Sequence, residues 1–387
     1  MQDFEKLKNK FKSIFEHEAT DFFSAPGRTE ICGNHLDHQH GMVMAAAVDV
    51  GINAAVRYRE DKQVQILSDG FGMVSLFLND LSPRADEEGT TQALVRGVAR
   101  ALSDAGIEIR GFAAVVSSDV PAGGGLSSSA AFEVLIGNIL APGADPVFLA
   151  KAGQYAENVY FGKPSGLMDQ LACSVGGMVF MDLEDPENPK LDKLNIDFSK
   201  FGYSLCLVNT GGSHADLTDQ YAAIPAEMRM VAESFGKSVL REVDADEFSK
   251  KADALKSTLP ERAVMRAEHF FAEEARVLAC KKAVLEKDIE QFLDIINESG
   301  KSSRYTLQNV TAEGEDADRS LERALDLSAE ILKGRGAVRV HGGGFAGSIQ
   351  AFVPTDVVEE YIKQMDEAFG AGACRVYQIN PEGGKRI

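Results

Sequence analysis

Three consecutive glycines followed by three serines make Asp119-Val-Pro-Ala-Gly-Gly-Gly-Leu-Ser-Ser-Ser-Ala-Ala131 the segment best suited to bind phosphate. Glycine lets the backbone come close to a polyanion because it has no Cβ. The N–H groups and positive dipole end of a following helix can bind phosphate oxygens. The serine hydroxyls can cap that helix, bind phosphate or ligate a magnesium ion. An ordinary glycine-rich turn with a serine N-cap is the alternative interpretation.

A second polar cluster lies between Ser24 and Gly41, and we expect it to form a loop. It contains the following donors and acceptors: Arg28, Asn34, His35, Asp37, His38 and His40. Such a mixture suits a small polyhydroxylated ligand. The three histidines could instead bind a metal, although the cluster has no cysteine and no second group elsewhere in the sequence. A solvated polar turn is the remaining alternative.

The third segment is Gly162-Lys-Pro-Ser-Gly-Leu-Met-Asp-Gln170. An aspartate in a turn that contains proline and glycine is commonly a cap. Asp169 is therefore either a structural cap or a catalytic carboxylate, and this segment alone leaves both interpretations open.

Other apparent nucleotide motifs fail on their spacing or context. Gly236-Lys-Ser and Gly300-Lys-Ser have Val231 and Ile295 where a P-loop needs its first glycine. The G-x-G-x-x-G at 342–347 precedes a strand-like segment, 348–353, whereas a dinucleotide fold needs a helix there. These segments therefore predict neither a P-loop nor a dinucleotide-binding fold.

The predicted elements place the glycine-rich segment between a strand at 112–116 and a helix that begins near Ala130. Expected strands and helices elsewhere are as follows: a long strand or hairpin at 43–58, strands at 64–67, 177–181 and 203–208, helices at 90–102 and 147–160, a mostly helical region at 217–332 with a long pattern at 261–296, and β-α-β from 338 to 379. The acidic stretch 182–189 suggests a surface excursion near a domain boundary. We predict an α+β protein of two lobes, residues 1–200 and 201–387, each with a mostly antiparallel sheet and helices on one side.

Composition narrows the class of protein. The chain has 387 residues and a net charge of −19, which disfavours nucleic acid or an anionic membrane as a partner. Apolar runs are too short for a membrane span, and the N-terminus is too polar for a signal peptide. Five scattered cysteines indicate reduced thiols. We expect a cytoplasmic protein that acts as a monomer.

Taken together, these segments resemble the galactokinases of the GHMP small-molecule kinase superfamily over nearly the whole chain. The cluster at 24–41 is similar to the signature G-R-V-N-L-I-G-E-H-T-D-Y. The glycine-rich segment is similar to P-x-G-x-G-L-S-S-S-A, the segment at 162–170 to G-x-M-D-Q, and 341–348 to G-x-G-F-G-G-S. The resemblance implies an N-terminal lobe like ribosomal protein S5 domain 2, a ferredoxin-like C-terminal lobe and an active site between them.

The resemblance also implies roles for individual residues. Asp169 would act on the anomeric hydroxyl of the sugar, and Arg28 would keep that carboxylate ionised. Sugar ligands would be Asn34, His35, Asp37 and Tyr221. ATP would contact Ser68, Gly123, Gly124, Gly125, Leu126, Ser127, Ser128 and Ser129. Ser129 and Glu157 would ligate Mg²⁺.

The expected reaction is phosphorylation of galactose to α-D-galactose 1-phosphate with ATP. The signature's Glu, Thr and Tyr are replaced here by Asn34, Leu36 and His38. An amide at position 34 would not repel a substrate carboxylate, so a kinase for galacturonate, glucuronate, an amino sugar or another hexose is an alternative. A non-catalytic galactose sensor is a second alternative, against which the complete glycine-serine loop argues.

Overall fold

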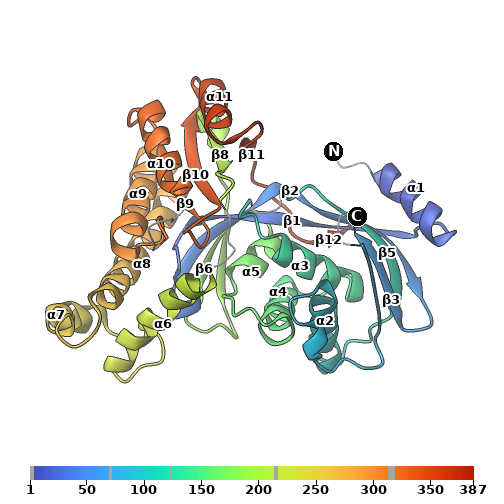
Figure 1. Cartoon of the computed structure of the whole chain (residues 1–387). Helices are drawn as coiled ribbons and strands as arrows, with labels where there is room; N and C mark the ends of the chain where they lie inside the picture. The colour runs from blue at the N-terminus through green and yellow to red at the C-terminus, as the bar shows by residue number, and fades with distance from the viewer. Residues whose placement is uncertain (1–3, 69–71, 122–123, 213–216, 313–318) are drawn as a thin grey trace.

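The protein has two lobes side by side, each built on one β-sheet (Figure 1). The computed structural model describes residues 4–68, 72–121, 124–212, 217–312 and 319–387. Strands of the first sheet are β1 (Asp21–Cys32), β2 (Met42–Arg59), β3 (Gln63–Ser68), β4 (Gly72–Phe77), β5 (Gly111–Ser118), β6 (Met178–Asp182), β7 (Lys190–Leu194) and β12 (Lys385–Arg386). Strands of the second sheet are β8 (Tyr203–Asn209), β9 (Ala337–His341), β10 (Ser348–Pro354) and β11 (Cys374–Tyr377).

The first sheet is organised around the long strand β2. Its order is β12-β1-β2-β5-β3-β4, and β6 pairs with β2 and then with β7. β2 pairs with β5 over Ile52–Arg59 and with β6 over Met42–Ala46, so one strand holds two neighbours on the same edge. Among the described strand pairs only β3 and β5 run parallel. Of the two alternatives predicted for 43–58, a long strand or a hairpin, the long strand is confirmed, and so is the mostly antiparallel sheet.

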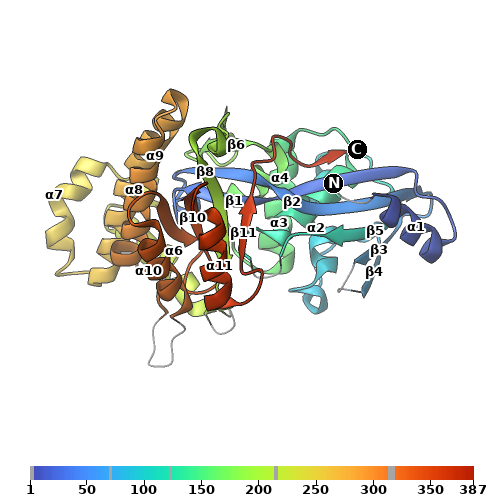
Figure 2. The ribbon, with the colours of Figure 1, turned by 90° about the horizontal axis from the view of Figure 1, so that it is seen from above.

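The second sheet has the order β11-β8-β10-β9, and all of its pairs are antiparallel. Its strand β8 begins just after residue 200, where we predict the boundary between the lobes. The position of that boundary stays a prediction. The chain also crosses back: β12 pairs with β1 through Phe23 and Arg386. Figure 2 accordingly shows the C-terminus of the chain on the first lobe.

The helices are α1 (Phe4–Phe15), α2 (Thr91–Asp104), α3 (Ser128–Leu140), α4 (Pro146–Tyr155), α5 (Met168–Val175), α6 (Thr218–Ser234), α7 (Ala245–Leu255), α8 (Glu261–Glu286), α9 (Ile289–Ser302), α10 (Ser320–Leu332) and α11 (Val358–Phe369). None of the helices within the described ranges is long and apolar enough to cross a membrane. The α+β, two-lobed fold predicted from the sequence is confirmed.

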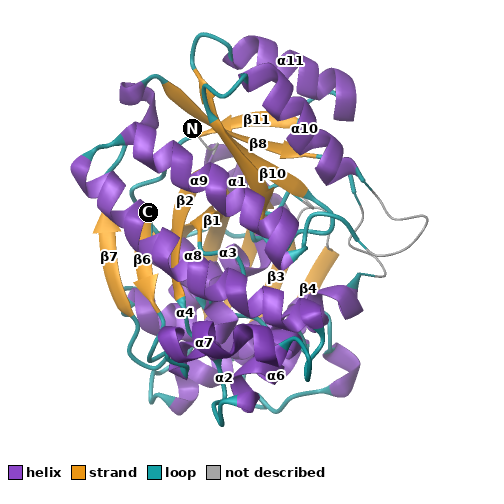
Figure 3. Cartoon of the chain, turned by 90° about the vertical axis from the view of Figure 1, so that its left-hand side faces the viewer, coloured by secondary structure: helices purple, strands orange, loops and turns teal. Residues whose placement is uncertain are grey.

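Helices cover both faces of each sheet, so the prediction of helices on one side is wrong. In the first sheet Ala113 and Val115 pack against Phe11 of α1, whereas the alternate residues Ala114 and Val116 enter the main core beside α2–α5. The period of two along a strand sends neighbouring residues to opposite faces. In the second sheet α10 and α11 lie on one face and α9 on the other (Figure 3).

Local differences from the sequence-based prediction have identifiable causes. The expected loop at 24–41 is strand β1 as far as Cys32, and residues 25–32 are all buried, so no polar–apolar alternation marks the strand. The helical pattern at 261–296 is broken by Lys287 in the left-handed conformation, and Asp288 caps α9. The acidic stretch 182–189 is the turn of the β6–β7 hairpin and not a link between lobes. The sequence did not predict α1, α5, β4, β7 or β12.

Candidate active site

Arg28 on β1 and Asp169 on α5 form a two-pronged ion pair at the centre of the predicted site. Arg28 Nε donates to Asp169 Oδ1 and Nη2 donates to Oδ2, both at 2.6 Å. The arginine side chain is 7% exposed and the aspartate side chain 30%, so one side of the carboxylate remains open. Burial pushes the pKa of Asp169 upward, but Arg28 and the hydrogen bonds hold it below its ordinary value. The pair is an ionised carboxylate aimed by a guanidinium.

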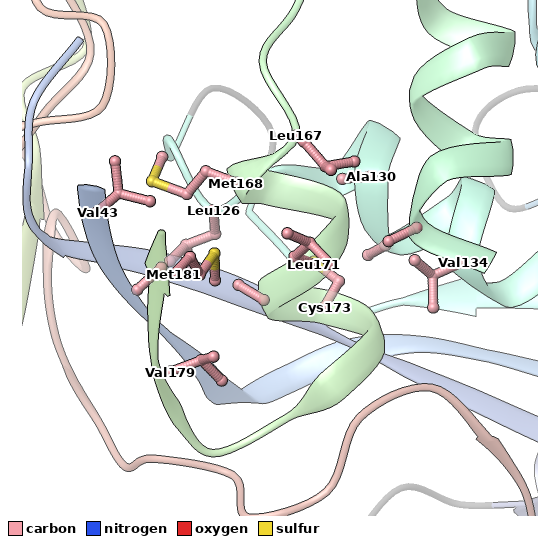
Figure 4. Packing of buried hydrophobic residues seen from close by; sticks show 14 of the residues in the cluster. Val43, Leu126, Ala130, Val134, Leu167, Met168, Leu171, Cys173, Val179 and Met181 are labelled. Atoms are coloured by element: carbon pink, nitrogen blue, oxygen red, sulfur yellow. The ribbon is translucent and has the colours of Figure 1, made fainter. Parts of the chain in front are cut away.

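Packing beneath α5 fixes the direction of Asp169. Leu167, Met168 and Leu171 are buried, and Figure 4 shows them in the cluster that also contains Leu126 of the glycine-rich loop. Asp169 occupies the first turn of α5, where the helix dipole favours a negative charge. Its carboxylate is bonded to Arg28 and does not cap the helix, although the sequence alone left the capping interpretation open.

The glycine-rich loop is tied to the same ion pair. Arg28 Nη1 donates to the carbonyl of Gly125, and the Arg28 backbone N–H donates to Leu126 O at 3.1 Å. The Ser127 hydroxyl donates to Asp169 Oδ2. Gly125 and Ser127 both have positive φ, +71° and +52°, so the loop turns sharply just before α3. The Arg28–Asp169 pair and the loop therefore form one hydrogen-bonded unit.

The N-terminus of α3 lies at the end of this loop. The Ser127 hydroxyl makes no cap hydrogen bond to α3, because it is bonded to Asp169. Ser128 and Ser129 are the first residues of the helix. The positive dipole end of a helix of 13 residues is thus available to an anion. Gly123 lies outside the described residues.

Ser129 and Glu157 bring two oxygen ligands together. Ser129 Oγ lies 3.4 Å from Glu157 Oε1, and Glu157, on the π-helical turn Ala156–Phe161, is 3% exposed. Lys163 Nζ donates to the same Oε1 at 3.1 Å, and Gln170 Nε2 donates to Oε2 at 2.9 Å. Two protein oxygens fit a Mg²⁺ ion that takes its other ligands from water and phosphate.

Glu133 is a site-adjacent acid that the sequence analysis missed. Gln170 Nε2 also donates to its Oε2 at 3.0 Å, so one amide joins Glu133 to Glu157. Burial, and then Glu157, raise the pKa of Glu133 well above its ordinary value. This shift favours the protonated form of Glu133. It lies within an apolar helical pattern and no local motif marks it.

Three predicted sugar ligands each bond to one carbonyl of the glycine loop between β9 and β10. Asn34 Nδ2 donates to Gly342 O at 2.7 Å and Tyr221 OH donates to Gly344 O at 2.5 Å. His35 Nε2 lies 2.9 Å from Gly343 O. These contacts join the turn after β1, which carries Asn34 and His35, and helix α6 to the loop between β9 and β10, and we call residues 342–344 the glycine strap.

The contacts also limit what these residues offer to a sugar. Burial lowers the pKa of His35 to about 4, so its neutral ring donates from Nε2 to Gly343 O. Asn34 is 1% exposed and both ends of its amide are bonded within the protein. Its geometry gives no support to the prediction that Asn34 is a sugar ligand.

Asp37 points to the same region as Asp169. It begins a short 3₁₀ turn, and the His38 backbone N–H donates to its Oδ1 at 2.9 Å. Burial, followed by repulsion from Asp169 and Glu30, raises the pKa of Asp37 to about 7. A second, partly protonated carboxyl group therefore lies near the ion pair and can bind a hydroxyl as donor or acceptor.

Two further sequence-based expectations concern residues at the edge of the site. Ser68 ends β3 and is paired with Val116 of β5, the strand that leads into the glycine-rich loop. The metal interpretation of the histidine cluster finds no support, because the described residues contain no group of three or more His, Cys, Asp or Glu side chains suited to a metal. His35 and His38 instead bond to each other at 3.2 Å.

His341 also belongs to the site, although its motif first resembled a dinucleotide fingerprint. Its Nε2 accepts from the Glu30 backbone N–H at 3.3 Å, so the proton of the neutral ring is on Nδ1. A Cβ on Gly125 would lie 2.9 Å from that Nδ1. His341 thus packs directly behind the glycine-rich loop, and only glycine fits between them.

Comparisons with known proteins show which family the chain resembles. The family model described as galactokinase galactose-binding signature matches residues 9–58, and that of the GHMP kinases N terminal domain matches 93–177. A galactokinase from Lactobacillus helveticus is 30% identical over 94% of this chain and 94% of its own. One from Streptomyces coelicolor is 30% identical over 97% of this chain and 96% of its own.

Solved structures extend the likeness to the whole fold. The structure of Lactococcus lactis galactokinase complexed with galactose superposes with a TM-score of 0.85 at 25% identity, over 100% of both chains. Methanococcus jannaschii mevalonate kinase gives a TM-score of 0.65 at 15% identity over 94% of this chain and 99% of its own, which speaks for the fold alone.

Proposed function

Because this chain belongs to the galactokinase family, we propose that it transfers the γ-phosphoryl group of ATP to the anomeric hydroxyl of galactose, giving α-D-galactose 1-phosphate and ADP. The observation that carries the proposal is the Arg28–Asp169 pair, bonded through Gly125 and Ser127 to the loop that would hold the phosphates. An acceptor-activating carboxylate and a phosphate loop are thus in direct contact.

Asp169 is the proposed catalytic group. Its open side accepts a hydrogen bond from the sugar O1–H and takes the proton as the O1–P bond forms and the bond to ADP breaks. Arg28 keeps the carboxylate ionised and aimed, since the bidentate contact fixes both oxygens. Phosphoryl transfer depends mainly on alignment and charge neutralisation, which this arrangement supplies.

The phosphates would be bound by backbone and not by a lysine of P-loop type. Gly124 to Ser129 and the N-terminus of α3 offer N–H groups and a positive dipole end. Ser129 and Glu157 would hold Mg²⁺, which neutralises phosphate charge when it is bound. Ser68 would approach the nucleotide from β3.

For the sugar, we propose Asp37 as the carboxyl ligand, with His35 and Tyr221 at the rim. Asn34 supports the glycine strap. The similar proteins bear the name galactokinase, so neither a uronate kinase nor a sugar sensor is favoured.

We further propose that the enzyme works as a cytoplasmic monomer. One chain supplies every residue of the proposed site. The five cysteines are unpaired and buried, which suits a reducing compartment. Light scattering of the purified protein at working concentration tests the monomer.

The activity is tested with purified protein, ATP and Mg²⁺ against galactose, glucose, glucosamine, galacturonate and glucuronate. We expect the highest kcat/KM with galactose and a product phosphorylated at O1 by ³¹P NMR. ATP consumption that no sugar stimulates would refute the proposal, and faster turnover of a uronate would move it to another substrate.

A further inference from the structure

Glu30 and Asn34 form a buried pair within the support of the active site. Asn34 Nδ2 donates to both carboxylate oxygens of Glu30, at 3.1 and 3.2 Å. Glu30 is 2% exposed and Asn34 is 1% exposed. Glu30 lies on β1, two residues after the guanidinium of Arg28, and Asn34 lies in the turn that follows this strand.

The surroundings allow only one orientation of the Asn34 amide. Its nitrogen faces acceptors, the Glu30 carboxylate and Gly342 O. Its oxygen accepts from Asn309 Nδ2 at 2.7 Å and from Ser303 Oγ at 3.3 Å. A carboxylate at position 34 would place an acceptor where the protein needs a donor.

The charge of Glu30 is compensated from the second lobe. Arg339 Nη2 donates to Glu30 Oε1 at 2.5 Å, and Nη1 donates to Ile31 O at 2.8 Å. Arg339 is itself 1% exposed. The buried Glu273 also faces Arg339, but it has its own partner in Arg276, whose Nε donates to Glu273 Oε2 at 2.7 Å. The two carboxylates are therefore matched by two guanidinium groups, and a further carboxylate at residue 34 would be unmatched.

The signature G-R-V-N-L-I-G-E-H-T-D-Y aligned on Gly27–His38 has an amide at position 30 and a carboxylate at position 34, the reverse of this chain. We propose that the amide and the carboxylate of the signature have exchanged places in this chain. The residue type at position 34 is then determined by Glu30 and not by the sugar. Both are positioning residues, acting through the glycine strap and Arg339. Asn34 is then no adaptation to a uronate, a statement that rests on the proposed function.

The test is a double-mutant cycle of Glu30→Asn, Asn34→Glu and the double variant, with the exposed Glu60→Asn as a control for loss of a carboxylate. Urea unfolding and galactose kinetics are measured on all proteins. Asn34→Glu should lower kcat/KM by about 100-fold or more, because two facing carboxylates repel strongly. Raising the pH from about 6 to about 8 should make that loss larger, because the variant folds well only while one of its two carboxyl groups keeps a proton.

The double variant should recover at least about tenfold of the loss in kcat/KM and unfold at higher urea than Asn34→Glu. A double variant whose losses equal the product of the single losses, or an Asn34→Glu enzyme that matches wild type, would overturn the exchange. The coupling between the two substitutions in urea unfolding is measured without any substrate. If the two substitutions are coupled in urea unfolding but the wild-type protein phosphorylates no sugar, the Glu30–Asn34 exchange stands and the proposed function is refuted. A double variant that switched to a uronate would refute control of residue 34 by Glu30.

Discussion

Asp37 lies directly against Gly166: a Cβ on Gly166 would fall 1.8 Å from Asp37 Oδ2. Gly166 is three residues before Asp169, so the contact joins the proposed sugar carboxyl to the turn that leads into α5. The φ of Gly166 is not in the left-handed region, and the close approach alone requires glycine.

Gly166→Ala should therefore displace Asp37 and raise the KM for galactose by about tenfold or more, the cost of misplacing one polar contact. The KM for ATP should change little. In the Asp37→Ala background the same substitution should add almost nothing, because the oxygen that it would strike is gone. Equal effects in both backgrounds would mean that Gly166 is needed for another reason.

The raised pKa of Asp37 predicts a pH dependence of stability. The group titrates at about 7 in the folded protein and at 3.8 in its ordinary state, so the folded state binds more protons between those values. The free energy of unfolding should consequently fall as pH rises from about 4 to about 7, by at most about 4 kcal/mol. Urea unfolding of wild type and Asp37→Asn at several pH values measures this contribution. A difference between the two proteins that stays constant with pH would contradict it.

Asp169→Asn should leave nucleotide binding nearly intact and lower kcat by about 10²–10⁴-fold. The amide keeps the shape of the carboxylate but cannot take the proton of the sugar hydroxyl. It also turns one acceptor of the Arg28 pair into a donor. Calorimetry with ATP serves as the control for binding. A variant that retained half of the wild-type turnover would exclude Asp169 as the proton acceptor.

Arg28→Lys tests whether the forked contact matters beyond its charge. A lysine cannot bond to both Asp169 oxygens and to Gly125 O at once. We expect kcat to fall by about 10²-fold or more, as when one fixed charge-stabilising donor is removed. If only the KM for galactose rises, Arg28 is a substrate ligand.

The sequence predicted the fold class and the segments of the site because each segment keeps its chemistry within a few residues. It could not predict how the segments support one another. Asn34 reads as a sugar ligand, but its partners Glu30, Asn309 and Gly342 come from distant parts of the chain. The sequence predicts a loop where β1 lies, since a strand buried on both faces shows no alternation of polar and apolar residues. Glu133 is recognisable only through the Gln170 amide that it shares with Glu157.

The assignment of Glu157 and Ser129 as magnesium ligands predicts that substitutions at these two residues and at Lys163 change the Mg²⁺ requirement in opposite directions. Glu157→Gln and Ser129→Ala should each raise the Mg²⁺ concentration that gives half-maximal rate, because an ion held by few protein oxygens depends on each one. Lys163→Ala should lower it, since the Lys163 ammonium, 62% exposed, competes for the same Glu157 oxygen at 3.1 Å. Mg²⁺ titrations at saturating ATP and galactose separate these effects. If all three titrations match wild type, the ion is held by water and phosphates alone; if Lys163→Ala instead raises the KM for ATP, the ammonium binds the nucleotide.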